Sequence, residues 1–276
     1  MKKLIITLFA LSLVSTSVSA ATWVAADRVA PVGKILLEKN GLPANIEFKV
    51  VDGIADNASA TTLNIINISK DDLAYAGNDN EVAAVVSNEI GHIVNGQTSK
   101  SKMREIAKAA ITSRLSSDNL ITTAANSEYI KNKTSLNDEK AADITGADLM
   151  IQAGYNPLAM VVLITKKPGS NFEILQGKPA NSERAMNTFD YLSYNYPSKV
   201  EAGYGCQEYR NFLTYANPIV KERTSNSKKL AKFNKEQQKN KATRVKNIAQ
   251  YKSMGASSWD VSYELLKSFT GNSEAK

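Results

Sequence analysis

The pattern of apolar and polar residues predicts a mostly helical chain with two short strands near its start. Residues 21–39 carry apolar residues at helical spacing, with an interruption expected near Pro31. Residues 45–52 and 62–68 alternate between apolar and polar positions, which is typical of strands with one buried face. We therefore expect an α+β fold, mostly helical, in which a small sheet packs on the helices.

A helix over residues 81–94 is the most regular of the predicted elements. Gly77 to Asn80 have turn chemistry, and Asp79 or Asn80 is suited to cap the helix that follows. The buried stripe of this helix is expected to consist of Val82, Val85, Val86, Ile90 and Ile93.

Further helices are predicted along the rest of the chain. They cover residues 101–115, residues 137–153 with an end at Gly154, a short helix that Pro157 opens, and residues 182–192 and 207–215. Residues 219–251 are compatible with a helix but show almost no apolar stripe. They are expected to form a helical extension.

The first twenty residues resemble a secretory signal peptide. Two lysines precede an apolar run, and Val18-Ser19-Ala20 fits a signal-peptidase site. No later segment is long and apolar enough to span a membrane, which takes about 20 apolar residues. We expect export to a bacterial periplasm or secretion, with no transmembrane segment in the mature chain.

Positive charge is concentrated near the C-terminus. Residues 221–252 hold eleven lysines and arginines against two glutamates, whereas the net charge of the whole chain is only +7. Such a segment could bind an anionic lipid surface or an acidic envelope protein, or it could simply be solvated. Few aromatic residues are available to stack on bases, which argues against nucleic acid. The expected division is a signal peptide (1–20), one domain (21–218) and a basic extension (219–276).

The predicted helix over residues 81–94 carries candidate chemistry in Asn88, Glu89 and His92, the only histidine of the chain. Asn88 and His92 are four residues apart and therefore point the same way from a helix. A zinc-peptidase helix has histidines at both positions and its general base at the position of Glu89. By itself this pattern also fits a polar face on an ordinary helix.

The helix predicted over residues 137–153 adds two carboxylates. Glu139 and Asp143 are one turn apart, and the small residues Ala142 and Gly146 leave room for close helix packing. A carboxylate from this helix could complete a metal site, and Asp143 could orient an imidazole ligand from behind. The alternative is a solvated acidic face.

Taken together, these motifs resemble a known family. The order of two strands, NDNEVAAVVSNEIGHIVNG (78–96), EKAAD (139–143) and AGYNP (153–157) is similar to the HtpX-like and CAAX-prenyl-protease-like zinc metalloendopeptidases, family forty-eight of the metallopeptidases. The family helix reads D-E-x-E-L-A-x-V-x-x-H-E-x-G-H-x. The resemblance covers residues 32–157, with a fainter similarity to about residue 204.

This resemblance implies an assignment for each site residue. The ligands of one zinc ion fall at Asn88, His92 and Glu139, the catalytic base at Glu89, and the residue behind the ligands at Asp143. The implied reaction is hydrolysis of a peptide or unfolded protein by a zinc-activated water that gives its proton to Glu89.

Three departures from the family pattern affect its chemistry. Asn88 offers a neutral amide where the family has a histidine, and zinc prefers imidazole, thiolate or carboxylate. A His-Pro element and a following arginine are replaced by Tyr196-Pro197 and Ala202. Two hypotheses stay open: a peptidase with retained activity, or a pseudoenzyme that binds peptides or acts as an envelope chaperone. The departures favour reduced or lost activity.

Overall fold

The computed structural model describes residues 23–44, 46–52, 65–96, 136–169, 178 and 181–254. The predicted signal peptide and the helix predicted over residues 101–115 fall outside these ranges. The elements are α1 (Ala25–Asn40), β1 (Glu47–Val51), β2 (Ile65–Ser69), α2 (Lys70–Leu73), α3 (Asp79–Val94), α6 (Leu136–Gln152), α7 (Leu158–Lys166), α9 (Ser182–Asn195), α10 (Pro197–Glu201), α11 (Gln207–Thr224) and α12 (Ser227–Met254). The predicted mostly helical α+β class is confirmed.

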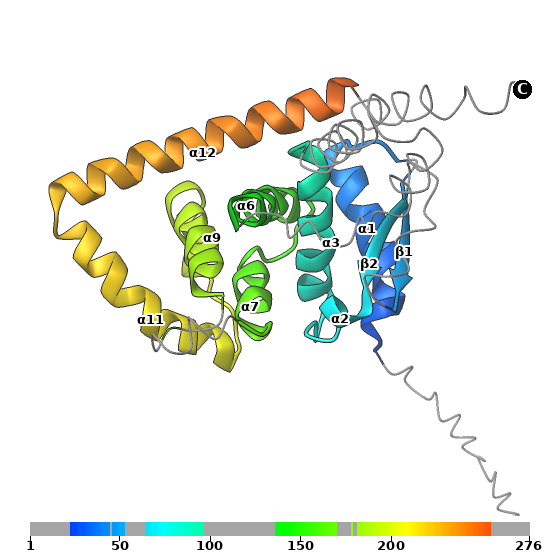
Figure 1. Cartoon of the computed structure of the whole chain (residues 1–276), viewed down its shortest axis with the longest axis horizontal. Helices are drawn as coiled ribbons and strands as arrows, with labels where there is room; N and C mark the ends of the chain where they lie inside the picture. Colours follow the sequence, from blue (N-terminus) through cyan, green and yellow to red (C-terminus); the bar gives the residue numbers. More distant parts are fainter. Residues whose placement is uncertain are drawn as a thin grey trace, which may run out of the picture.

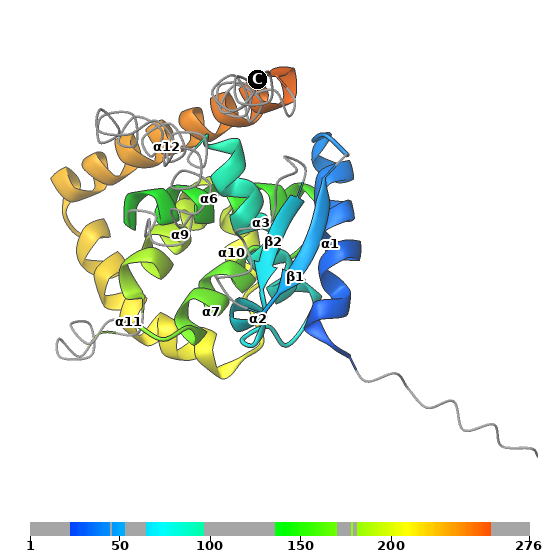
Figure 2. The same ribbon diagram turned by 45° about the vertical axis from the view of Figure 1, so that its right-hand side comes forward.

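Both predicted strands are present, and they pair in parallel. Phe48 lies opposite Ile66 and Val50 opposite Ile68. Figures 1 and 2 show β1 beside α1 and β2 on the side of α3, so the small sheet and α1 form one edge of the molecule. The ring of Phe48 lies where a Cβ on Gly33 would be, which explains a glycine in the middle of α1. The sheet therefore packs on α1 through β1 and on α3, which carries Asn88, Glu89 and His92, through β2, as expected.

Helix α1 runs through Pro31 without the interruption that the sequence suggested. That expectation was wrong because the apolar residues on both sides of the proline are fully packed: Val29, Val32 and Leu36 are each at most 1% exposed. Burial of side chains of this size is worth about 1.5–3 kcal/mol each. It therefore offsets the roughly 3 kcal/mol cost of a proline inside a helix.

The core lies between α3, α6, α7 and α9. Helix α7 is buried from Leu158 to Ile164 on all sides, and Figure 1 shows it enclosed by α3, α6, α9 and α11. Helix α3 lies between the sheet on one side and α6 and α7 on the other. The site described below sits on this central helix, so the core fixes its backbone.

The basic segment forms a long helix that crosses the body rather than extending away from it. In Figure 1, α12 passes from the end of α11, above α9 and α6, to the C-terminal end of α3. Its residues Gln237, Arg244 and Tyr251, seven residues apart, are buried on the face that lies against the body. The boundary expected at residue 218 lies inside α11, which continues to Thr224. Among the described helices, none has the length and hydropathy needed to cross a bilayer.

Candidate functional site

Helix α3 begins at a residue whose side chain caps it, and most of its residues are buried in the core. The Asn78 side chain accepts a hydrogen bond from the backbone N–H of Glu81 at 3.1 Å. Asn78 is therefore the cap, not Asp79 or Asn80 as the sequence suggested. The apolar stripe predicted for this helix is buried throughout. Only Asn88 and Glu89, among residues 81–94, are partly exposed.

Two glycines let α3 and α6 approach closely. A Cβ on Gly91 would lie 2.5 Å from the backbone oxygen of Ala142, and one on Gly146 would lie 2.9 Å from the backbone of Ser87. No side chain fits at either position without moving the helices apart. This contact brings the polar residues of α3 beside the carboxylates of α6.

The structure brings together four of the five predicted site residues and adds an arginine. Asn88 Nδ2 donates to Asp143 Oδ1 at 2.8 Å, and His92 Nε2 lies 3.4 Å from Glu139 Oε1. Arg184, from the first turn of α9, lies between the two carboxylates. Its Nε and Nη2 donate to the two oxygens of Asp143 at 2.9 and 2.8 Å, and Nη2 also lies 2.8 Å from Glu139 Oε2.

Burial sets the electrostatics of this cluster. Asp143 is fully buried, which raises the pKa of its carboxyl, and the charge and hydrogen bonds of Arg184 oppose that rise. Burial also lowers the pKa of Arg184, but the charge and hydrogen bonds of Asp143 and the charge of Glu139 outweigh it, so the pKa is raised. The guanidinium is therefore a permanent positive charge between two carboxyl groups.

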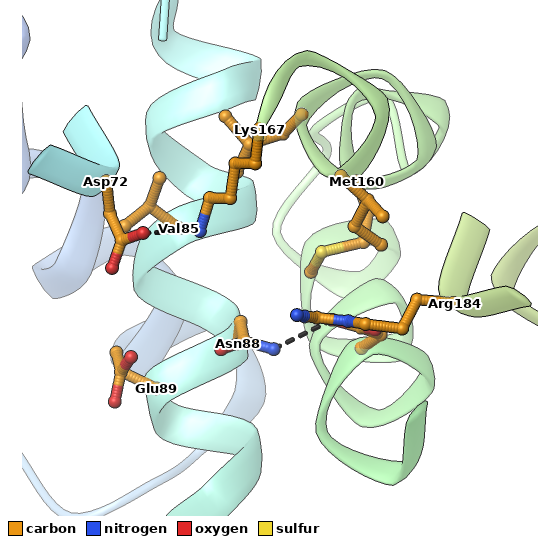
Figure 3. Close-up of a pocket in the computed structure, with 10 residues that line it drawn as sticks. Asp72, Val85, Asn88, Glu89, Met160, Lys167 and Arg184 are labelled. Carbon is orange, nitrogen blue, oxygen red and sulfur yellow. Dashed lines mark hydrogen bonds and ion pairs between the residues drawn. The ribbon is translucent and has the colours of Figure 1, made fainter. Parts of the chain in front are cut away.

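Glu89 faces a different side of α3. In Figure 3, Asn88 points from α3 toward Arg184, whereas Glu89 leaves the helix on the side away from that arginine. Burial raises the pKa of Glu89, and the charge of His92 partly opposes this. A raised pKa makes the carboxylate a stronger base, as the predicted role requires.

A small pocket opens over the residues of α3 that carry these groups. It is lined by Asp72, Val85, Asn88, Glu89, Asp143, Met160, Leu163, Ile164, Lys167 and Arg184. Lys167 Nζ and Asp72 Oδ1 form an ion pair of 2.6 Å at its edge, drawn as a dashed line in Figure 3. The pocket is thus apolar along α7, whereas its other lining residues, apart from Val85, are polar or charged.

The residues of this site do not fit a zinc ion. Two ligands of one tetrahedral zinc stand about 3.4 Å apart, so His92 and Glu139 alone have a suitable spacing. The third predicted position, Asn88, turns its amide N–H toward Asp143. The Arg184 guanidinium is paired with Glu139 and would repel a cation there. In the part of the chain that the structure describes, no three His, Cys, Asp or Glu side chains are grouped to hold a metal.

The Tyr196 position lies outside this cluster. The resemblance aligns Tyr196 with the histidine of a His-Pro element, and the Tyr196 hydroxyl donates to Asp148 Oδ1 at 2.5 Å. Tyr191 donates to the other oxygen of Asp148 at 2.7 Å, and Lys241 from α12 also contacts this carboxylate. The Tyr196 hydroxyl is therefore part of a hydrogen-bonded network around Asp148, to which α12 contributes Lys241.

Arg184 is the site residue that sequence reasoning missed. One signal for it was present: a cation in the first turn of a helix is disfavoured by the helix dipole, so it needs an acidic partner elsewhere. The sequence does not say which carboxylate that partner is. Lys167 and Asp72 gave no signal at all.

One comparison with known proteins gave a match. The sequence model of peptidase family M48 matches residues 25–225, which include every residue of the site described above. Searches of curated proteins and of solved structures gave no significant match.

Proposed function

The chain belongs to peptidase family M48, whose members generally use zinc, and we propose that in this chain zinc-dependent peptide hydrolysis is reduced or lost. The observation that carries the proposal is the hydrogen bond from Asn88 to Asp143. The Nδ2 group at the first ligand position donates to Asp143, which leaves only the neutral amide oxygen to offer a lone pair, and zinc prefers imidazole, thiolate or carboxylate. Only His92 and Glu139 remain as strong ligands, and metal affinity falls steeply with ligand number.

A non-catalytic role in binding peptides or unfolded proteins follows from what the site keeps. The pocket beside Glu89 and Asn88 retains hydrogen-bonding groups next to the apolar wall of α7. A peptide needs this combination, because its backbone requires polar partners and its side chains gain from apolar contact. We propose an exported, HtpX-like or CAAX-prenyl-protease-like protein of the bacterial envelope that holds such chains without cutting them.

Casein hydrolysis by the untagged mature protein tests the loss of activity. We expect the wild-type rate to equal that of the Glu89→Gln variant, with or without added zinc. Hydrolysis that a chelator blocks and that Glu89→Gln abolishes would show an active peptidase. Binding of labelled unfolded casein, measured with the chelator present, separates a peptide-binding protein from an inert one.

A second candidate function, binding to an anionic lipid surface, is favoured by the charge pattern of α12. The lysines at intervals of four, three, four and seven residues fall on one exposed face, opposite the buried Gln237 and Arg244: Lys228, Lys232, Lys235, Lys239 and Lys246. Their Cα atoms span about 27 Å of helix. Each lysine near an anionic surface contributes about 1 kcal/mol.

Vesicle binding tests this lysine face. The variant with all five lysines changed to glutamine should bind vesicles with phosphatidylglycerol at least about tenfold more weakly than wild type. The matched control removes five exposed lysines elsewhere: Lys34, Lys39, Lys49, Lys70 and Lys199. Equal losses in both variants would indicate a general effect of net charge instead.

A further inference from the structure

The carboxyl groups of Glu139 and Asp143 on α6 both contact the guanidinium of Arg184. Asp143 is fully buried and Glu139 is partly buried, with its side chain 21% exposed. Leaving such groups without a compensating charge is costly, because the protein interior solvates a carboxylate poorly. In a zinc site of this family pattern, the ion would provide the positive charge beside both of them.

Arg184 provides that charge here. Its side chain is 18% exposed and makes three contacts of 2.8–2.9 Å, two with Asp143 and one with Glu139. The fork geometry on Asp143 fixes the guanidinium plane, which lysine could not do. Asn88 completes the arrangement by donating to the same Asp143 oxygen that accepts from Nη2.

We propose that Arg184 is a resident cation that takes the structural place of the metal ion, holding Glu139 and Asp143 together and excluding divalent cations from them. This inference rests on the proposed loss of zinc-dependent activity and gives it a cause beyond the missing ligand. Arg184 acts here as a positioning residue for the two carboxylates. The metal-free protein then has both carboxylates paired with a cation and needs no metal ion to stabilise the site.

The arrangement predicts competition between Arg184 and a divalent cation. Removal of the guanidinium takes the fixed positive charge away from Glu139 and Asp143, so His92 and Glu139 should bind zinc without repulsion from an arginine. Zinc should also restore the lost stability, because a ligand that binds only the folded state stabilises it. The wild-type protein should respond neither to zinc nor to a chelator.

Thermal unfolding of the untagged mature protein, with and without zinc, tests this. Arg184→Met should lower the Tm in metal-free buffer by at least about 5 °C, because breaking a buried ion pair is strongly destabilising. Added zinc should recover a large part of that loss. Arg184→Lys keeps the charge without the fork, so it should lose less stability and gain nothing from zinc.

The chain offers a matched control in a second largely buried ion pair, Arg223–Asp190, with a contact of 2.7 Å and side chains 14% and 15% exposed. Arg223→Met should lose stability but should not respond to zinc. Equal zinc rescue of both methionine variants would overturn the proposal. So would an Arg184→Met variant within about 1 °C of wild type in metal-free buffer.

Two further outcomes separate this proposal from the proposed function. If Arg184→Met does not fold, the wild-type protein alone decides: a Tm that falls with chelator overturns the resident cation. If Arg184→Met folds but ignores zinc while wild type fails to cut casein, the resident cation is wrong and the proposed function stands. Zinc-dependent cleavage by wild type contradicts the proposed function directly.

Discussion

At the scale of single residues, the site departs from a zinc centre at two side chains. Asn88 Nδ2 donates to Asp143, and the Arg184 guanidinium lies 2.8 Å from Glu139. In the proposed assignment, Asn88 places a neutral amide where a zinc peptidase has an imidazole, and Arg184 adds a positive charge. These effects act on the same small volume, so their consequences for metal binding should depend on one another.

A histidine at position 88 tests the effect of Asn88 on zinc binding. Asn88→His should increase zinc affinity at least about tenfold, because a third strong ligand joins His92 and Glu139. Combining it with Arg184→Met should increase the affinity by more than the two single changes together. Isothermal titration with zinc measures both.

The control for an added histidine is Asn187→His. Asn187 is half-buried on α9 and donates to the backbone oxygen of Lys140, so an imidazole there lies near α6 without the family's geometry. A similar gain in zinc affinity for Asn187→His would contradict the assignment of Asn88 to the ligand position.

A pH-dependent contribution to stability is expected from Asp79. Hydrogen bonds from Arg28, at 2.9 and 2.7 Å, hold the pKa of this carboxyl below its usual range. A carboxyl with a lowered folded pKa stabilises the fold above its unfolded pKa of about 3.9, and this is lost as the pH falls through the folded pKa. The urea midpoints of wild type and Asp79→Asn should therefore differ at pH 7 and converge in acid.

Arg28→Gln should reproduce this pattern, since it removes the partner instead of the carboxyl. Both side chains are more than a third exposed, so the effect is small and is sensitive to salt. A midpoint difference that stays constant from neutral to acid pH would contradict the ion pair as its source.

The sequence predicted which residues of α3 and α6 form the site better than it predicted how their side chains pair. Spacing alone put Asn88 and His92 on one face and Glu139 and Asp143 on another, and the structure brings the two faces together. The spacing of residues along the sequence could not predict that a third helix, α9, contributes to the site. Arg184 lies 41 residues beyond Asp143, and its contact depends on how α9 packs against α6.

At the scale of elements, the contact between α3 and α6 determines the site. Gly91 and Ala142 touch through backbone atoms, and a wider spacing would separate Asn88 from Asp143. Short hydrogen bonds tolerate little displacement, because they weaken steeply with distance and angle. The glycine in the motif is therefore explained by packing.

Gly91→Ala should destabilise the protein by about 1–3 kcal/mol, although alanine is the better helix former. The added Cβ would lie 2.5 Å from the Ala142 oxygen, and this backbone atom cannot rotate away. Urea unfolding measures the loss of stability.

Gly205→Ala is the control for this change. A Cβ at Gly205 meets no atom within 4 Å, so its effect should stay within about 0.5 kcal/mol. If Gly91→Ala were as stable as wild type, the close contact would not be what fixes the spacing of the helices.

Element positions could be predicted where the local pattern was strong. The predicted helix 81–94 is α3 with a start two residues earlier, and both strands were located correctly. The expected break at Pro31 failed because tertiary packing outweighed a local cost. A local sequence pattern reflects the helix and strand propensities of the residues, whereas burial depends on which other elements pack against them.

At the scale of the whole molecule, α12 was the least predictable part. Its inward face contains polar residues, and so the sequence shows almost no apolar stripe. Arg244 donates to the backbone oxygen of Ala141 at 2.8 Å, and Asn247 donates to Asn95 at 2.9 Å. These contacts tie the basic helix to α6 and to the C-terminal end of α3. Hydropathy could not reveal an interface made by such hydrogen bonds.

The same helix joins the Tyr196 position to the rest of the molecule. Lys241 contacts both Asp148 and the Tyr196 hydroxyl, so a basic residue of α12 lies beside the tyrosine that the resemblance aligns with a His-Pro element. The chain thus belongs to family M48 by its sequence, while α9 and α12 make polar contacts with Glu139, Asp143 and Tyr196, to which the proposed assignment gives metallopeptidase positions.

Metal analysis of the untagged mature protein, purified without chelator, tests the central claim most directly. The arrangement of Asn88, Arg184 and Glu139 predicts a zinc content far below one ion per chain, unchanged after dialysis against zinc and removal of the excess. A content close to one zinc per chain, lost in Glu139→Gln, would contradict it.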